Sequence, residues 1–286
     1  MTRVTTILLL HERGQPWTSS QFNADISRPA WSAFGQPMPH YAAGRLNIGA
    51  VAGEPAVDLR IHRTSRPSTS QCAFFTGSHH LRWQSETGVR AKGPWRLNGG
   101  VAEIDAVGYH ERVRGRWGWP ELDEWVFGFA NDLGSDDDRP PAYAGVFTFI
   151  KPRWPADATT ASFMLWKDGV LRRHFPRRRV TFAVRGELPR DRVTLAPPLA
   201  GLFGVRPMAP VPKRLVISAR MADDWAVLDF EAEACARVII PSETSQLPFS
   251  VHEVVGDCVL AGSLNGTRFE IQTRGIVEFS GGARHD

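Results

Sequence analysis

The strongest constraint on the fold of this 286-residue chain is the regular alternation of apolar and polar residues. The runs at 57–62, 180–185, 215–219 and 269–271 each place an apolar residue at every second position. Successive side chains of a β-strand point to opposite faces, so each run can face a core on one side and water or a ligand on the other. No long run shows the spacing of an amphipathic helix. The sequence therefore predicts strands almost throughout.

Turn dipeptides separate several of these runs. Asp168-Gly169 follows an apolar run that begins at Phe163, Asn265-Gly266 follows one that ends at Leu264, and Gly99-Gly100 stands before a third. Such dipeptides accept the positive φ of tight hairpins. Strands joined by hairpins pair antiparallel, which predicts an all-β fold of sandwiches or barrels.

Two polar or proline-rich stretches interrupt the strand pattern. Residues 134–141 read GSDDDRPP, which predicts a surface loop and a boundary between two β-rich domains. Residues 196–212 contain five prolines, and the stretch cannot form a central strand. This second loop is long enough to cover a pocket as well as to connect strands.

The charge pattern does not favour a nucleic-acid partner. The formal net charge is only +4, and its densest point is the basic run at 172–179. Nucleic-acid-binding proteins usually combine a basic face with a known module, and the chain shows no such module. We expect this run to be a solvated strand edge, where charge discourages pairing with another sheet.

Cysteines and hydropathy exclude further classes. Cys72, Cys235 and Cys258 are far apart with no CxxC spacing, which argues against a disulfide framework and a zinc site. We expect each to be a small buried residue. No apolar stretch has the length of a membrane span or of a signal peptide, so the sequence predicts a soluble, cytoplasmic protein.

Motifs for cofactor and covalent chemistry are also missing. The chain has no GxGxxG after a strand, no phosphate-binding loop, no HExxH and no GxSxG. His110-Glu111 and His252-Glu253 begin like HExxH, but neither has a second histidine four residues after the first. The sequence therefore gives no support for a nucleotide cofactor, a catalytic metal or a serine nucleophile. General acid–base chemistry remains.

Residues 104–132 bring together acids, an imidazole, arginines and large aromatic rings, as a ligand pocket does. The candidate catalytic residues are Glu111, Tyr109 and His110. The candidate substrate-binding residues are Trp117, Trp119, Trp125, Arg112, Arg116, Phe127 and Asp132. If the segment is extended, Tyr109 and Glu111 share one face and His110 lies on the other.

Each of these residue types has a structural alternative. Burial beside aromatic rings would raise the pKa of Glu111, whereas nearby arginines would lower it and could reduce the residue to a salt bridge. Tryptophans most often pack cores and sheet interfaces, although their faces also stack on polyenes or attract carbocations.

Gly108-Tyr109-His110-Glu111, followed by Trp117-Gly118, resembles the signature GYHEHxWG. That signature belongs to the carotenoid 1,2-hydratases (hydroxyneurosporene synthases) and the AttH-like two-domain lipocalin-like proteins. The C-terminal residues 273–279, TRGIVEF, are similar to the closing strand of that superfamily. Arg112 stands where the signature has its second histidine, and the Trp-Gly pair comes two residues late. The fungal decalin-forming Diels–Alderases are similar in architecture.

The resemblance implies an N-terminal β-sandwich-like domain at 1–133 and a C-terminal lipocalin-like barrel at 142–286, both antiparallel. It also implies cofactor-free chemistry on a hydrophobic polyene, polyketide or terpenoid bound in or between the domains. We expect a cyclase or isomerase, with an intramolecular [4+2] addition as one form. The alternatives are hydration of an isolated double bond and a lipocalin-like carrier without chemistry. The oligomeric state stays open.

Overall fold

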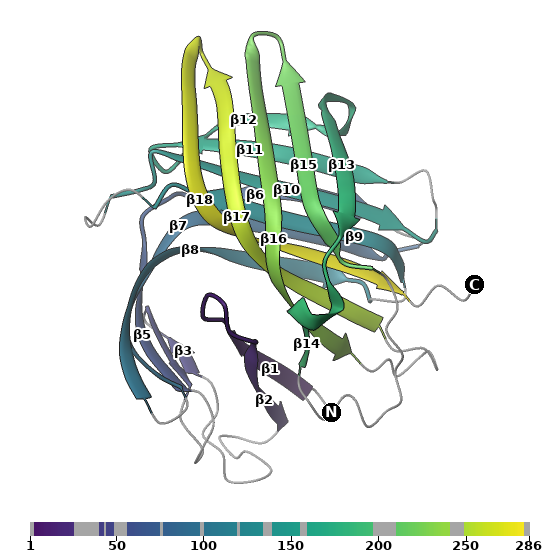
Figure 1. The fold of residues 1–286 in the computed structure, drawn as a ribbon. Coiled ribbons are helices and arrows are strands. Elements are labelled where there is room, and N and C mark those ends of the chain that lie inside the picture. Colours follow the sequence, from purple (N-terminus) through teal and green to yellow (C-terminus); the bar gives the residue numbers. More distant parts are fainter. Residues whose placement is uncertain are drawn as a thin grey trace.

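Strands form nearly all of the computed structural model (Figure 1). The structure describes residues 3–25, 40–42, 44–48, 56–74, 77–97, 100–118, 121–133, 139–154, 159–196, 210–240 and 249–282. The strands are β1 (Arg3–Leu10), β2 (Thr18–Asp25), β3 (His40–Ala42), β4 (Arg45–Ile48), β5 (Ala56–Arg63), β6 (Ser68–Phe74), β7 (His80–Leu97), β8 (Gly100–Arg116), β9 (Leu122–Asn131), β10 (Tyr143–Pro152), β11 (Thr160–Lys167), β12 (Val170–Pro176), β13 (Val180–Glu187), β14 (Val193–Ala196), β15 (Pro212–Met221), β16 (Asp224–Ile240), β17 (Phe249–Leu264) and β18 (Thr267–Gly282). Two single-turn 3-10 helices, η3 (Arg177–Arg179) and η4 (Arg190–Arg192), flank β13.

A large curled sheet contains strands β9 to β18. Its order is β12-β11-β10-β9-β18-β17-β16-β15-β13, and β14 adds to β16 as a parallel partner. All other pairs in the sheet are antiparallel. The curl brings β15–β18 across β9–β12 (Figure 1). The enclosed core contains Phe147, Phe163, Phe175, Leu215, Leu228, Phe230 and Leu260. The prediction of an all-β, antiparallel fold is confirmed.

Two of the three predicted hairpin turns lie in this sheet. Asp168 and Gly169 have φ of 52° and 71° and join β11 to β12. Asn265 and Gly266 have φ of 51° and 78° and join β17 to β18. Both turns use the positive φ that their residues accept, so the two predictions are confirmed. The third turn includes Gly99, which lies outside the described residues.

A smaller sheet has the order β3-β4-β5-β7-β6, with β8 paired to β7. The hairpin β1–β2 lies between the two sheets. Leu8 packs against the cluster that contains Leu46 and Leu59 of the small sheet. Ile7 and Leu9 pack against a cluster of the large sheet, and alternation along β1 produces this two-sided contact.

Strand β9 is apolar on both faces because it is covered on both. Val126 and Ala130 point into the curled core. Trp125 and Phe127 point the other way and pack against Trp83 of β7. Residues 122–131 thus pair with β10 and β18 in the large sheet while facing the small one. The division into two domains at 134–141 stays a prediction.

A glycine permits the close packing of the large sheet beside this interface. A Cβ on Gly275 would lie 2.5 Å from the Phe129 carbonyl oxygen and 2.6 Å from Cys258 Sγ. Contacts this short are not tolerated by any side chain, so β17, β18 and β9 can approach only with glycine here. Gly275 is three residues before Glu278, which makes it part of the frame of the site described below.

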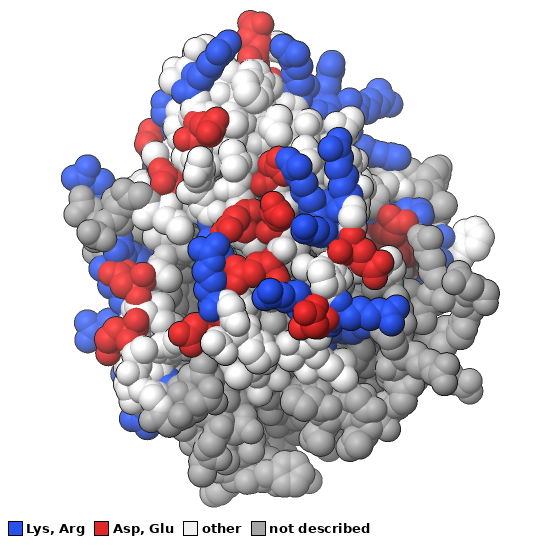
Figure 2. Space-filling model, in the orientation of Figure 1, with Lys and Arg blue, Asp and Glu red and all other residues white. Residues whose placement is uncertain are grey.

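Several surface charges form ion pairs. Over the face of β15–β18, basic and acidic side chains are intermixed (Figure 2), and Arg214 pairs with Asp229. The basic run at 172–179 begins on β12, the outermost strand of the sheet path, which confirms the predicted strand edge. Cys235 and Cys258 are free and buried, as predicted. Among the described residues, no helix has the length and apolar character needed to span a membrane.

Candidate functional site

The centre of the candidate site is Glu111 on β8. The indole nitrogen of Trp83 on β7 donates a hydrogen bond of 2.7 Å to Glu111 Oε2. The Tyr109 hydroxyl lies 2.7 Å from Ser85 Oγ and 3.4 Å from the same carboxylate oxygen. Tyr109 and Glu111 therefore share one face of β8, as strand alternation predicts.

Two further glutamates approach from the large sheet. Glu253 on β17 and Glu278 on β18 are directly opposite each other in the strand register. Glu278 is in turn opposite Phe127 on β9, so both carboxyl groups lie on the face that packs against the small sheet. Glu111, Glu253 and Glu278, called the glutamate cluster below, thus come from three strands and two sheets.

Burial of the glutamate cluster strongly favours the protonated carboxylic acids. Burial raises the pKa of Glu111 to about 7, and the negative charge of Glu253 adds to this increase while the Trp83 N–H opposes it. Burial, and then the charges of Glu253 and Glu111, raise the pKa of Glu278 well above its usual range. Burial likewise raises the pKa of Glu253. Like charges in a site of low dielectric cannot all ionise, so the cluster keeps protons at neutral pH.

The pair Glu253 and Glu278 shares a hydrogen bond, which requires a proton between the two carboxyl groups. The Oε1 atom of Glu278 is buried and has no hydrogen-bond partner among the described residues. Buried polar atoms without a partner are rare and call for an explanation. As whole residues, all three glutamates keep some solvent-accessible surface.

Stacked aromatic rings surround the glutamate cluster. Trp83 stacks on Trp125 with ring centroids 4.2 Å apart, and Trp117 also stacks on Trp125 at 5.8 Å. Tyr109 stacks on Phe129 at 4.9 Å and contacts Phe127 at 5.0 Å. Part of this aromatic wall is core packing, because Trp83 and Trp125 are almost completely buried.

The two His-Glu dipeptides are divided between opposite faces of their strands. His110 Nδ1 lies 3.2 Å from Glu86 Oε2, on the other face of β8 from Glu111. His252 Nε2 accepts a hydrogen bond of 2.9 Å from Arg237, again away from the neighbouring glutamate. In both dipeptides the glutamate faces the interface between the sheets and the histidine does not.

Other predicted residues lie outside this arrangement. Arg112 and Arg116 are exposed, and Arg116 contacts Ser78. Asp132 donates its backbone N–H to the Tyr143 carbonyl at the end of β9. Trp119 lies outside the described residues. Within the described part of the chain, no arginine forms an ion pair with Glu111. Burial, and not a salt bridge, is therefore the largest influence on the pKa of Glu111.

A pocket with apolar walls adjoins the glutamate cluster. Its volume is about 490 Å³. Val255 lies two residues after Glu253, Ile276 lies two residues before Glu278, and the two are opposite each other in the register. Alternation places them on the same face as the glutamates. The remaining lining residues are Arg90, Asp105, Ala106, Val107, Gly108, Phe129, Leu133, Arg274 and Gly275. We call this space the apolar pocket.

Sequence reasoning missed three members of this arrangement, namely Trp83, Glu253 and Glu278. Glu253 and Glu278 each interrupt a run of apolar residues, and an acid on the buried face of a strand was the available signal. Trp83 gave no signal of its own. The described residues include no group of three or more His, Cys, Asp or Glu side chains arranged to hold a metal ion.

Comparison with known proteins identifies the fold. No protein-family model and no curated protein sequence matches the chain. Among solved structures, an AttH-like protein from Nitrosomonas europaea matches with a TM-score of 0.57 at 13% identity, over 94% of this chain and 77% of that one.

Two further structures share the fold. CghA, solved with Sch210972, matches with a TM-score of 0.52 at 10% identity, over 99% of this chain and 90% of CghA. Kievitone hydratase from Nectria haematococca matches with a TM-score of 0.51 at 11% identity, over 82% of this chain and 64% of the hydratase. The chain therefore has the AttH-like, lipocalin-like fold, which is the fold implied by the signature that its sequence resembles.

Proposed function

We propose that the protein is a cofactor-free enzyme that protonates a carbon–carbon double bond of a hydrophobic polyene, terpenoid or polyketide. The observation that carries this proposal is the glutamate cluster, because three carboxyl groups with raised pKa lie against stacked aromatic rings. Burying several carboxyl groups costs folding free energy, and groups with strongly perturbed pKa values cluster at functional sites. Neutral carboxylic acids at neutral pH are suited to proton donation.

The environments of the glutamates suggest their roles. Glu278 has a strongly raised pKa and lies beside Glu253, which can accept a hydrogen bond from it. We therefore assign Glu278 as the general acid. Its proton passes to one carbon of the double bond, the π electrons form the new C–H bond, and the other carbon becomes cationic. The ionised form of Glu111 can take up a proton in the later step, because its pKa of about 7 is close to neutral pH.

The aromatic rings would stabilise the cationic intermediate. Tryptophan faces attract cations by about 0.5–2 kcal/mol, and most strongly when water is excluded. Phe127 and Phe129 line the same face of β9 as Trp125, so a cation formed at Glu278 would meet several rings. A carrier of neutral lipids would gain nothing from the glutamate cluster, which is why we place carriage below catalysis.

The fate of the cation decides the reaction. Attack by a second double bond of the same molecule closes a ring and leaves a new cation, which becomes a double bond when it loses a proton to Glu111. Without ring closure, loss of a different proton to Glu111 moves the double bond. Both outcomes conserve the atoms of the substrate and constitute the proposed cyclase or isomerase activity. Capture by water, with the excess proton returned to a carboxylate, is hydration and is the alternative outcome at the same site.

Isotopic labelling of the product tests the proposal. Turnover of linear polyenes and terpenoids in D₂O should place one solvent deuterium on carbon, and only hydration adds oxygen from ¹⁸O-labelled water. Glu278→Gln should abolish turnover, whereas Glu103→Gln, an exposed control on β8, should keep it. Product without carbon-bound deuterium, formed equally well by Glu278→Gln, would contradict proton transfer.

A [4+2] addition is the second candidate. The stacked rings, held in place by the hydrogen bonds of Trp83 to Glu111 and of Tyr109 to Ser85, form a fixed aromatic wall, which suits the holding of a folded polyene. This reaction requires no proton transfer from Glu278. It therefore predicts product without solvent deuterium and the same rate in the Glu278→Gln variant.

A further inference from the structure

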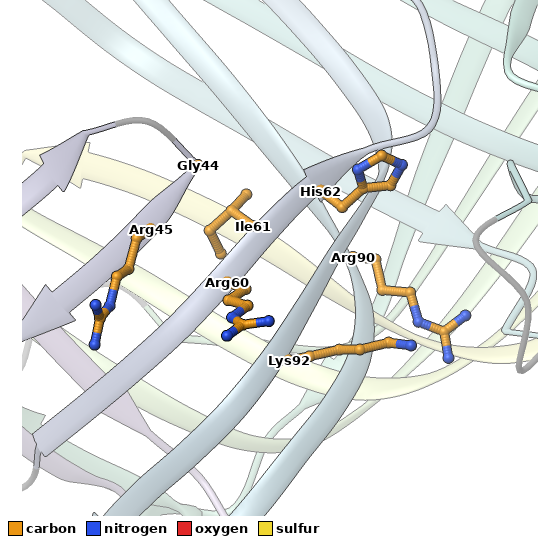
Figure 3. Close-up of a pocket in the computed structure, with 7 residues that line it drawn as sticks. All are labelled: Gly44, Arg45, Arg60, Ile61, His62, Arg90 and Lys92. Atoms are coloured by element: carbon orange, nitrogen blue, oxygen red, sulfur yellow. The ribbon is translucent and has the colours of Figure 1, made fainter.

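A second hollow lies on the small sheet and is lined mainly by basic side chains (Figure 3). Its volume is about 460 Å³. The lining residues come from the turn before β4 and from β4, β5 and β7, and they are Gly44, Arg45, Arg60, Ile61, His62, Arg90 and Lys92. We call this space the basic hollow.

The basic hollow has more cations than carboxylates. Arg45 makes two hydrogen bonds to Asp58, and the buried Arg90 makes two to the exposed Asp105. Lys92 also lies 3.6 Å from Asp105. Among the described residues, Arg60 forms no ion pair.

The strand register places cations beside one another in the basic hollow. On β15 and β16, by contrast, Arg214 pairs with Asp229 and Lys213 with Glu231. In the hollow, Arg60 is opposite both Arg45 and Lys92 in the strand register, so three cations form a row across β4, β5 and β7. Neighbouring like charges repel, and an anion bound between them would remove that cost.

The basic hollow adjoins the apolar pocket. Arg90 lines both spaces, and it is opposite Val107 of the pocket wall in the strand register. Lys92 is likewise opposite Asp105, which also lines the pocket. Directly opposed residues share a face, so both spaces open on the same side of the small sheet. A path of lining residues thus runs from the glutamate cluster past Ile276 and Val107 to Arg60.

We propose that the substrate carries an oxyanion, a carboxylate or a phosphate, which binds in the basic hollow while its apolar body occupies the apolar pocket. This proposal rests on the proposed function, because the glutamate cluster would then receive the double bond at the other end of the molecule. Arg60 and Lys92 would provide the charge-assisted hydrogen bonds, and Arg90 would form the wall between head and body.

Binding of a fluorescent fatty acid tests the proposal without turnover. cis-Parinaric acid and its methyl ester have the same apolar chain and differ in the anionic group. The protein should bind the acid about tenfold more tightly than the ester, as one charge-assisted contact provides. Arg60→Gln should remove this difference and leave ester binding unchanged. Arg220→Gln, an exposed control on β15, should keep it.

The outcomes separate this proposal from the proposed function. Equal affinity for acid and ester in the unmodified protein, or equal weakening of both by Arg60→Gln, would overturn the basic hollow as an anion site. Inorganic phosphate that weakens acid binding to the level of the ester would support it. Glu278→Gln should bind both probes as the unmodified protein does. If this variant loses turnover and keeps its preference for the acid, both proposals are supported. If it keeps turnover, only the proposed function is contradicted.

Discussion

Replacing Glu111 with glutamine should stabilise the protein at neutral and alkaline pH. The pKa of Glu111 is raised from 4.5 to about 7 in the folded protein. A carboxyl whose folded pKa is raised contributes stability below the pKa of the unfolded chain, and this contribution is lost as pH rises through the folded pKa. Glutamine has the same shape and never ionises, so the variant avoids that loss.

The size of this stabilisation follows from the shift in the pKa of Glu111. A difference between 4.5 and about 7 corresponds to at most about 3 kcal/mol, because each pKa unit is worth 1.36 kcal/mol. Glu111 keeps some solvent access, which reduces the expected effect to about 1–2 kcal/mol. The Trp83 hydrogen bond can be made to the amide oxygen of glutamine, so the variant should lose little of it.

Urea unfolding at a series of pH values measures this effect. Glu111→Gln should match the unmodified protein below about pH 4.5 and exceed its free energy of unfolding by about 1–2 kcal/mol above about pH 8. Glu103→Gln, exposed on the same strand, should track the unmodified protein at every pH. A Glu111→Gln variant that is less stable at alkaline pH would show that the ionised carboxylate stabilises the fold, and would refute the argument from burial.

Two other predictions concern the frame of the site. Trp83→Phe keeps an aromatic ring against Trp125 but removes the N–H that donates to Glu111. The pKa of Glu111 should therefore rise further, and the pH–rate profile should move to higher pH with it. A profile that stays in place would contradict the effect of Trp83 on Glu111. Gly275→Ala should lower the free energy of unfolding by about 1–3 kcal/mol, because its Cβ would meet the Phe129 carbonyl at 2.5 Å. Gly108→Ala, whose Cβ would have 3.7 Å to its nearest neighbour, should cost less, and equal losses in thermal melts would contradict the packing argument.

Alternation predicted the strands because burial on one face imposes a period of two. The alternation at 57–61 predicted β5. Asp168-Gly169 and Asn265-Gly266 predicted their hairpin turns because only a few residues accept positive φ. The curl of the large sheet could not be predicted in the same way. It depends on long-range pairing, such as β9 with β18, that no local pattern encodes.

The candidate site shows the same division. Alternation correctly placed Tyr109 and Glu111 on one face, since that needs only local geometry. The sequence could not pair Glu111 with Glu253 and Glu278, which lie more than a hundred residues away and meet it only through packing between sheets. For the same reason the competition between burial and arginines at Glu111 was open until the structure placed Arg112 and Arg116 at the surface.

Carbon-13 NMR of glutamate-labelled protein tests the central claim most directly, because it reports the protonation of each carboxyl without a substrate. Assignment through Glu111→Gln, Glu253→Gln and Glu278→Gln identifies the three signals. Glu111 should titrate near a pH of about 7, and Glu278 should stay protonated well above the usual range of a glutamate pKa. Titration of all three near the ordinary value of 4.5 would contradict the account, because the cluster would then hold no proton to donate at neutral pH.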